Sequence, residues 1–473
     1  MSWRIPVQRV SRRQFIRFTG LGAAGLALAA CAPAAEEAAV GTGATAEVVN
    51  LRYQSRELQE AEGVQELWSE FYPEFKANNP DIEVEFLPQP GGVNLREGVL
   101  AQMVAGDAPD LIEFCCWSST FFVQKGETLN LQAYIDRDAD EVDLDDYYEG
   151  QFDPWVDEQG DIHLMPRFTG TMALYYNIDM FEDMGVDTPP HEWGAWNHED
   201  YVAIGENFVS REPGQPISWA TSNYGMNANW LSQYWIRGFG ANMVNPDDNK
   251  LCGLGEPAAV DALHYIHSII WDSQIFAYGS DIGMGVNQLF ESGRISMMEM
   301  GPWSLGATMR NATFRWDVAP LPMGPSEITT HQSVDGTMIW NKTDHPDESW
   351  ETLKWLTSPF YGKLYAKWGT KQPSRISVLP EFQAALIDRD ERFGDIDIDV
   401  FTSSIAASLG GPEEMFANDF TCKDTILKPA FDQVMLLNEA PVDLIVQHAD
   451  IVNRFNAGEI AIEDLGGAMA ALG

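Results

Sequence analysis

The residues with the clearest metal-binding spacing lie in an acidic stretch near position 140. Asp136, Asp138 and Asp140 alternate as they do in a calcium-binding loop, where oxygen ligands recur at every second residue. Such a loop needs glycine at its sixth position and glutamate at its twelfth, but this chain has Glu141 and Tyr147 there. We therefore expect a solvated acidic loop and no metal site.

Sequence motifs for enzymatic catalysis are absent. The chain contains no H-E-x-x-H, no G-x-S-x-G and no phosphate-binding P-loop. A pair of carboxylates could hydrolyse a glycoside, but among 71 acidic residues such pairs arise by chance. The pattern G-x-G-x-x-G occurs at 20–25 with no strand before it, so it does not indicate a dinucleotide site. We predict that the protein is not an enzyme and has no cofactor.

The charge of the chain narrows its possible partners. There are 29 basic and 71 acidic residues, which give a formal net charge of −42. A surface this acidic repels nucleic acid and anionic lipid, and it favours neutral or cationic ligands. We expect a small-molecule ligand and no nucleic acid.

The N-terminus has the features of an export signal. Arg12-Arg13 resembles a twin-arginine signal, and the apolar run from Phe18 to Ala30 is too short to span a bilayer. "LALAAC" resembles a bacterial lipobox, in which Cys31 would carry the lipid, and residues 31–47 read as a flexible tether. We expect residues 1–30 to be a signal peptide and the protein to be an exported, cell-surface or periplasmic lipoprotein anchored to the membrane. A membrane helix, or cleavage without lipid, is the alternative.

The remaining cysteines could form disulfides, because an exported protein meets an oxidising environment. Cys115, Cys116, Cys252 and Cys422 allow three pairings. The adjacent Cys115 and Cys116 are poorly placed to pair with each other. We favour a disulfide between Cys252 and Cys422.

Apolar periodicity predicts an α/β fold. Residues 48–54, 82–86 and 109–114 have the patterns of strands, and residues 64–75 and 95–106 between them have helical spacing. Strands and helices that alternate in this way build a largely parallel sheet.

Four segments carry the strongest functional signal. They are "LAQMVAGDAPDLIEF" (100–114), "GDIHLMPRFTGTMALYYNIDMFEDMG" (160–185), "LFESGRISMMEMGPWSLG" (289–306) and "HPDESWETLKWLTSP" (345–359), the last followed by "PSRISV" (373–378). In this order they resemble the family 1 extracellular solute-binding proteins of ABC importers, the group that holds the maltose-binding proteins.

The resemblance implies a two-lobed, periplasmic-binding-protein-like fold with a hinged ligand cleft. Hinge crossings are expected near 168–172, 318–321 and 372–376. Lobe one would then comprise 48–168 plus 321–372, and lobe two 172–318 plus 376–473. The cleft would close on a sugar by hinge motion, and the protein, a monomer, would deliver the sugar to ABC permease subunits.

The resemblance also implies where the ligand binds. The C–H faces of a sugar ring pack on aromatic rings, and its hydroxyl groups need carboxylates, amides or arginine. Trp303 of "GPW" matches the family's stacking tryptophan. The other expected ligand-binding residues are Trp117, Ser118, Arg56, Glu57, Phe168, Thr171, Trp230, Tyr234, Trp235, Asp335, Gly336 and Arg375.

The hinge departs from the maltose-binding pattern. "FTGT" places Thr171 where an acidic ligand-binding residue is expected, so the polar contacts differ and maltose itself is not indicated. A polyol or a glycerol phosphate is the alternative ligand, with Arg56, Arg167 and Arg375 as phosphate-binding candidates. A secreted carbohydrate-active enzyme and a surface sensor are the rival functions.

Overall fold

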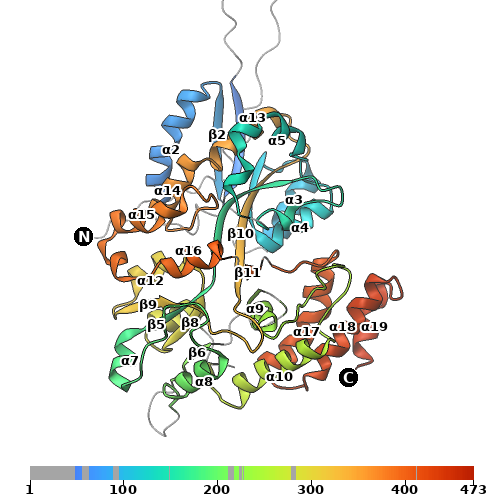
Figure 1. Ribbon diagram of the computed structural model, residues 1–473. Coiled ribbons are helices and arrows are strands. Elements are labelled where there is room, and N and C mark those ends of the chain that lie inside the picture. The colour runs from blue at the N-terminus through green and yellow to red at the C-terminus, as the bar shows by residue number, and fades with distance from the viewer. Residues whose placement is uncertain are drawn as a thin grey trace, which may run out of the picture. The chain divides into compact units, whose positions relative to one another are not determined.

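The computed structural model describes most of the chain from Val48 onwards (Figure 1). The described residues are 48–55, 63–88, 95–148, 150–210, 218–222, 226, 228, 230–277, 284–407, 409–411 and 413–472, without the side chains of 95, 115–118, 230 and 231. The predicted signal peptide, Cys31 and the tether lie outside them, as do Arg56 and Glu57. No helix in this described part is both long and apolar enough to cross a membrane.

Among the described residues, a large sheet of six strands, drawn from 49–171, 330–339 and 410–411, organises one half of the molecule, which we call the first half. Its strands are β1 (Val49–Ser55), β2 (Ile82–Pro88), β3 (Leu111–Cys115), β4 (Leu164–Thr171), β10 (Thr330–Ile339) and β11 (Gly410–Gly411). β1 pairs in parallel with β2 and β3, as the predicted alternation of strands and helices requires. β10 runs antiparallel to both β3 and β4 and joins them.

Helices cover both faces of the large sheet, and each face has its own hydrophobic cluster (Figure 1). One face packs against α2 (Val64–Asn78), α13 (Pro346–Leu356) and α14 (Pro359–Gly369), and the other against α3 (Leu95–Ala105) and α4 (Cys116–Gln124). Phe71 and Trp350 belong to the first cluster, and Phe114 and Trp155 to the second. Because it is covered on both sides, β4 is buried at every residue.

A small sheet, drawn from 173–177, 297–300 and 316–319, organises the other half of the molecule, which we call the second half. β5 (Ala173–Asn177) lies between β8 (Met297–Met300) and β9 (Trp316–Ala319) and is antiparallel to both. β6 (Thr221–Ser222) and β7 (Phe276–Ala277) form a short parallel pair. The remaining α-helices are α5 (Gln132–Arg137), α6 (Ala139–Val142), α7 (Ile178–Met184), α8 (His198–Glu206), α9 (Trp230–Gly238), α10 (Pro257–Trp271), α11 (Val286–Glu291), α12 (Leu305–Asn311), α15 (Phe382–Arg389), α16 (Asp399–Ala406), α17 (Lys428–Phe431), α18 (Asp443–Asn456) and α19 (Leu465–Ala470). π-Helical turns at Thr421–Leu427 and Asp432–Leu436 flank α17.

The connections between the two sheets lie side by side. β4 ends at Thr171 and β5 begins at Ala173, so the chain passes from the large to the small sheet at Met172. The return, 320–329, extends beyond the expected 318–321. A third segment, 370–375, leads from α14 (Pro359–Gly369) towards α15 (Phe382–Arg389). It is held to β4 because the Thr169 N–H donates to the carbonyl of Gln372 (3.3 Å).

The helix α15 ties the two halves together. The sequence assigns it to lobe two, but it packs against α14 of the first half. Ala366 of α14 shares a hydrophobic cluster with Phe382 and Leu386 of α15. The limits of the lobes therefore stay a prediction.

Cys252 and Cys422 are buried free thiols, so the structure lacks the disulfide that the sequence favoured. Each is held by α18 instead: the Cys252 N–H donates to Asn453 Oδ1 (2.7 Å), and Asn456 Nδ2 donates to Cys422 Sγ (3.5 Å). Burial raises the pKa of both thiols to about 12, which keeps them protonated.

Candidate functional site

The carboxyl ends of the parallel strands define one edge of the large sheet. β1, β2 and β3 end there at Ser55, Pro88 and Cys115. On the neighbouring strand β10, Asp335 pairs with Cys115 on one side and with Phe168 on the other, and its side chain is mostly buried. Ligands of open α/β sheets bind outside the carboxyl ends of the strands. This edge, next to the connections between the sheets, is where a ligand site is expected.

Trp303 lies where the hydrophobic clusters of the two halves meet. Its ring is partly buried, packs against three clusters, and meets Phe168 edge to face with 6.2 Å between the ring centres. Its Nε1 donates to Met300 Sδ (3.0 Å). Gly301 leaves room for the ring, because a Cβ atom there would lie 2.0 Å from it. The indole is thus held rigidly and is not fully enclosed, as a stacking platform requires.

Thr171 and Phe168, predicted to bind ligand at the first connection, both make contacts inside the protein. The hydroxyl of Thr171 is fully buried, lying 2.6 Å from Ser404 Oγ and 3.1 Å from the carbonyl of Phe401, so it links β4 to α16. Phe168 is also buried, and its ring contacts the ring of Trp303 edge to face.

Tyr234 and Trp235, which the sequence predicts to bind ligand, are core residues in this structure. Both are completely buried in the cluster that α8, α9 and α10 share. The ring of Trp235 lies 4.2 Å from that of His198. Burial raises the pKa of the nearby Glu299 to about 7, although Tyr201, Tyr234 and Trp235 lower it in part.

Gly336 and Arg375 are structural as well. A Cβ atom at Gly336 would lie 2.5 Å from the ring of Trp155, so this glycine allows β10 to pack against Trp155. Arg375 is buried: its Nε donates to the carbonyl of Thr357 (2.6 Å) and its Nη1 to Asp146 (3.2 Å). Their roles in ligand binding stay predictions.

For Trp117, Ser118 and Trp230 the structure describes only the backbone. Trp117 and Ser118 lie in the first turn of α4, directly after β3 and therefore at the carboxyl edge. Trp230 is the first residue of α9. Their side chains are outside the described part, as are Arg56 and Glu57 altogether.

A cavity of about 930 Å³ lies between the two halves of the chain. Its wall is formed on one side by α4 and the 153–163 hairpin, and on the other by 246–250 and 413–417. Its lining residues are Thr120, Val123, Gln124, Lys125, Gly126, Asp153, Pro154, Val156, Asp157, Glu158, Gln159, His163, Pro246, Asn249, Lys250, Glu413, Met415, Phe416 and Ala417. None of the ligand-binding residues predicted from the sequence is among them.

Hydrogen bonds shape the walls of this cavity. Gln124 Nε2 donates to the carbonyl of Phe416 (3.2 Å) and so connects the two halves. His163 lies between Thr128 (2.8 Å) and Asp157 (3.0 Å). Burial acts to raise the pKa of Asp157, but His163 and the N–H groups of Asp161 and Gln159 together hold it below its ordinary value. The cavity therefore presents an ionised carboxylate next to amides and two lysines.

Sequence reasoning missed a second place where the halves meet. Arg96, in the first turn of α3, is buried, with its guanidinium 4.0 Å from the ring centre of Phe420 and 3.8 Å from Asp424. Burial lowers the pKa of Arg96, and Asp424 and Asp419 oppose that effect. The sequence gives no signal for this contact, because Arg96 is a single charged residue in the first turn of α3 and its partners Phe420 and Asp424 are more than 300 residues away in the chain.

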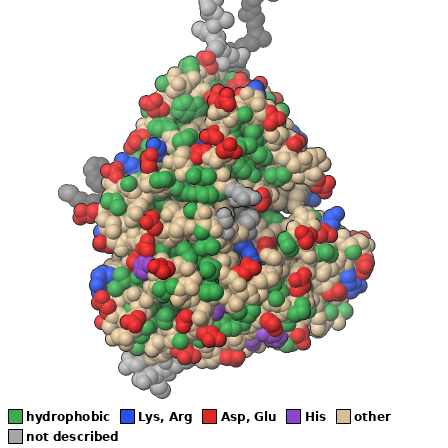
Figure 2. Space-filling model, viewed as in Figure 1, with side chains coloured by type: hydrophobic (Ala, Val, Ile, Leu, Met, Phe, Trp, Pro, Cys, Tyr) green, Lys and Arg blue, Asp and Glu red, His purple; other side chains and the backbone are tan. Residues whose placement is uncertain are grey.

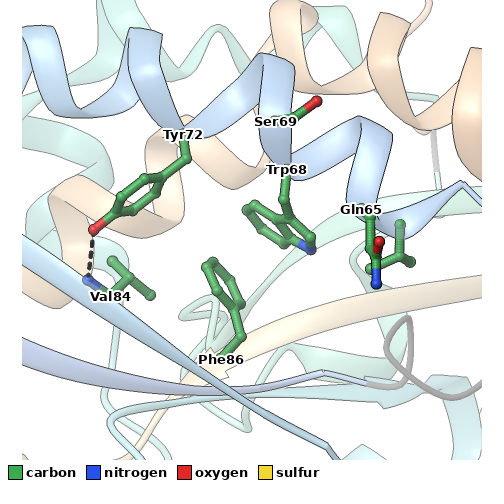
Figure 3. A pocket seen from close by; sticks show the side chains of 7 residues that line it. Gln65, Trp68, Ser69, Tyr72, Val84 and Phe86 are labelled. Atoms are coloured by element: carbon green, nitrogen blue, oxygen red, sulfur yellow. Dashed lines mark hydrogen bonds between the residues drawn. The ribbon is translucent and has the colours of Figure 1, made fainter.

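A smaller cavity of about 480 Å³ lies between α2 and β2 (Figure 3). Trp68 and Phe86 point into it, with 3.8 Å between their ring centres, and Tyr72 lies at its far end. All of its lining residues belong to the first half of the chain, so movement of one half against the other would not open or close it.

Comparison with known proteins identifies the family. Residues 58–363, more than half of the chain, match the bacterial extracellular solute-binding proteins, and the chain belongs to this family. A Brucella abortus protein named only as a binding protein is 27% identical over 297 residues, which cover 60% of this chain and 66% of that protein. The arabinooligosaccharide-binding protein of Halalkalibacterium halodurans is 22% identical over 289 residues, 56% of this chain and 62% of that protein. The chain thus spans somewhat less than two thirds of the length of these relatives.

Solved structures show the same fold. The ABC substrate-binding protein Lmo0181 of Listeria monocytogenes, in complex with cycloalternan, has a TM-score of 0.73 at 18% identity over 87% of this chain and 100% of its own. UgpB of Mycobacterium tuberculosis, in complex with glycerophosphocholine, has a TM-score of 0.70 at 18% identity over 87% of this chain and 99% of its own. The predicted two-lobed α/β fold is confirmed. The family and these neighbours are binding proteins rather than enzymes, in agreement with the sequence.

Proposed function

We propose that this protein is an extracellular receptor that captures a sugar or an oligosaccharide between its two lobes and delivers it to the permease of an ABC importer. Membership of the solute-binding family supports capture of a solute. We further propose the lobe limits expected from the sequence, 48–168 plus 321–372 and 172–318 plus 376–473, and a monomeric protein. In this arrangement α4 and the 153–163 hairpin belong to lobe one, and 246–250 and 413–417 to lobe two.

The observation that carries the proposal is the chemistry of the space between the halves. The cavity of about 930 Å³ is within the range of small-molecule sites. Its carboxylates, amides and lysines can satisfy hydroxyl groups as both acceptors and donors, and the exposed side chain of Val156 adds a small apolar surface. Trp303 does not line this cavity; its partly buried ring at the junction of the clusters is a separate candidate surface on which the C–H face of a sugar can pack.

Neutral ligands fit better than phosphorylated ones. Acidic side chains are spread over the visible face of both halves (Figure 2), and carboxylates outnumber lysines in the lining of the cavity. Arg167 and Arg375, which the sequence offered as phosphate ligands, are buried in ion pairs with Glu113 and Asp146. A glycerol phosphate is nevertheless the second candidate, because UgpB binds a related solute with the same fold.

Export and anchoring are part of the same proposal. A receptor for an importer acts outside the membrane, which fits the lipobox and the twin-arginine pattern. Replacing Cys31→Ala is expected to release the protein from membranes and to leave ligand binding intact. Tight membrane association of this variant in fractionation would contradict the role of Cys31.

The direct test is a thermal-shift and calorimetric screen against sugars, oligosaccharides, polyols and glycerol phosphates. A true ligand raises apparent stability by RT ln(1 + [L]/Kd), about 2.7 kcal/mol at one hundred times Kd. Trp303→Ala is expected to weaken the best ligand by about 2–3 kcal/mol. Trp68→Ala is the matched control, because Trp68 is a partly buried tryptophan that lines the smaller cavity between α2 and β2. Tight binding of a phosphate ester but of no neutral sugar would overturn the carbohydrate assignment.

A further inference from the structure

Arg96 is a buried cation that contacts both halves of the protein. From its own half, the ring of Phe121 on α4 approaches it with the guanidinium 5.4 Å from the ring centre. From the other half, the ring of Phe420 lies closer, at 4.0 Å, and the carboxylate of Asp424 lies at 3.8 Å. The guanidinium therefore lies between two aromatic rings of different halves and next to a carboxylate.

The segment that carries Phe420 and Asp424 is itself rigidly held. Lys423, fully buried, forms ion pairs with Glu413 (3.1 Å) and Asp419 (3.2 Å). Asp419 also accepts a hydrogen bond from the N–H of Phe416 (3.0 Å). These bonds are internal to 413–424. The segment is joined to the second half because Cys422 and Ile426 are buried in that half's hydrophobic cluster and Asn456 Nδ2 of α18 donates to Cys422 Sγ (3.5 Å). We therefore expect Phe420 and Asp424 to move with that half.

The contact depends on how closely the halves approach each other. Arg96 is 6% exposed in this structure, and Phe420 and Asp424 of the second half are among the residues next to its guanidinium. Separation of the halves would take the Asp424 carboxylate, whose side chain is already 35% exposed, and the Phe420 ring, 40% exposed, away from the guanidinium. A desolvated cation–π contact of this kind contributes more than one at an open surface.

We propose that Arg96, with Phe420 and Asp424, is a positioning element that holds the two lobes together and thereby sets how tightly the protein binds its ligand. The inference rests on the proposed capture of a solute between the lobes. For a receptor that binds only when closed, the apparent Kd equals the intrinsic Kd of the closed form divided by the fraction of molecules that are closed. Loss of the Arg96 contact lowers that fraction and weakens every ligand by the same factor, without changing which ligand is preferred.

The experiment measures lobe separation first, without any ligand. Labels are attached through non-natural amino acids at Val104 of lobe one and Ile462 of lobe two, both well exposed, and their distance distribution is recorded by pulsed electron paramagnetic resonance. The wild type is expected to contain a population at the separation of this structure. Arg96→Ala and Phe420→Leu are each expected to shift it to longer distances, and Arg96→Lys to restore part of it. With a ligand, Arg96→Ala is expected to raise the apparent Kd about tenfold, equally for each ligand bound.

The matched control is Arg137→Ala. Arg137 also faces an aromatic ring, Tyr134 at 5.2 Å, and pairs with Asp138 (2.9 Å) and Asp347 (3.2 Å), but all of these lie within lobe one. It is expected to leave the distance distribution unchanged. The proposal is overturned if Arg96→Ala and Phe420→Leu both leave the distances as in the wild type, or if affinity falls while the distances stay the same. Failure to find any sugar ligand would contradict the proposed function, whereas the distance measurement would still decide the role of Arg96.

Discussion

The buried carboxyl group of Glu299 makes the stability of the second half depend on pH. Glu299 lies on β8, is 5% exposed, and has its pKa raised by burial from 4.5 to about 7. Between these two values the folded protein binds a proton that the unfolded chain has released. The contribution to stability is therefore fully present below pH 4.5 and is lost as the pH rises through 7. A difference of this size corresponds to about 3 kcal/mol.

Glu299→Gln keeps the shape of the side chain and removes its titration. Denaturant unfolding of wild type and variant is compared at intervals from pH 5 to pH 8. We expect the stability of the wild type to fall by about 2.5 kcal/mol relative to the variant across this range, since part of the contribution is already lost at pH 5. His198, whose pKa burial lowers to about 3, acts in the opposite direction: its contribution is lost as the pH falls below 6.5. It is present in both proteins, so it cancels in the difference. Parallel stability profiles would show that Glu299 titrates normally and would refute the reasoning.

Three further predictions concern residues that the sequence assigned to the cleft or to a disulfide. Trp303→Ala is expected to lower the free energy of unfolding by about 2–3 kcal/mol, less than for a fully buried tryptophan, and also to weaken ligand binding; calorimetry with a denaturation curve measures both, and unchanged affinity would place Trp303 in the core alone. Arg375→Ala is expected to destabilise by about 3–5 kcal/mol because Asp146 loses its buried partner, while the folded fraction keeps its affinity; selective loss of affinity would restore its predicted ligand role. A reducing agent is expected to leave the unfolding midpoint unchanged, since Cys252 and Cys422 are free thiols; a large drop would reveal a disulfide.

Local pattern was enough to predict the elements of the large sheet. The strand expected at 82–86 is β2, and the helix expected at 64–75 is α2, which ends at Asn78. Pro73 lies within α2 without ending it. Apolar periodicity reports directly on burial, and burial is what fixes each of these elements.

The candidate site was harder to predict because residue type does not say which face of an element is buried. Tyr234 and Trp235 are the kind of aromatic residues that bind sugars, yet α9 turns them into the core. Arg96 and Phe420 lie far apart in sequence, and only the packing of α3 against the 413–427 segment brings them together. The ligand-binding role of Trp303 stays a prediction; the structure shows that Gly301 and Pro302 define the local backbone next to its ring, at the junction of the clusters.

The use of arginine bears on which ligand the cleft accepts. The chain has few cations for its acidity, and near the junction of the lobes it uses them internally: Arg167 pairs with Glu113, Arg237 with Glu414, and Arg375 with Asp146. Each of these guanidinium groups is already neutralised and mostly buried, so binding a phosphate there would require breaking a buried ion pair, which costs about 3–5 kcal/mol when one partner is left alone. A neutral sugar requires no such exchange. It needs only hydrogen bonds of both directions, which the carboxylates, amides and lysines of the cavity can make, and an apolar surface to pack on. The same arginines that make a phosphate ligand costly also hold the strands of the hinge in place, which is why we expect the protein to favour an uncharged ligand.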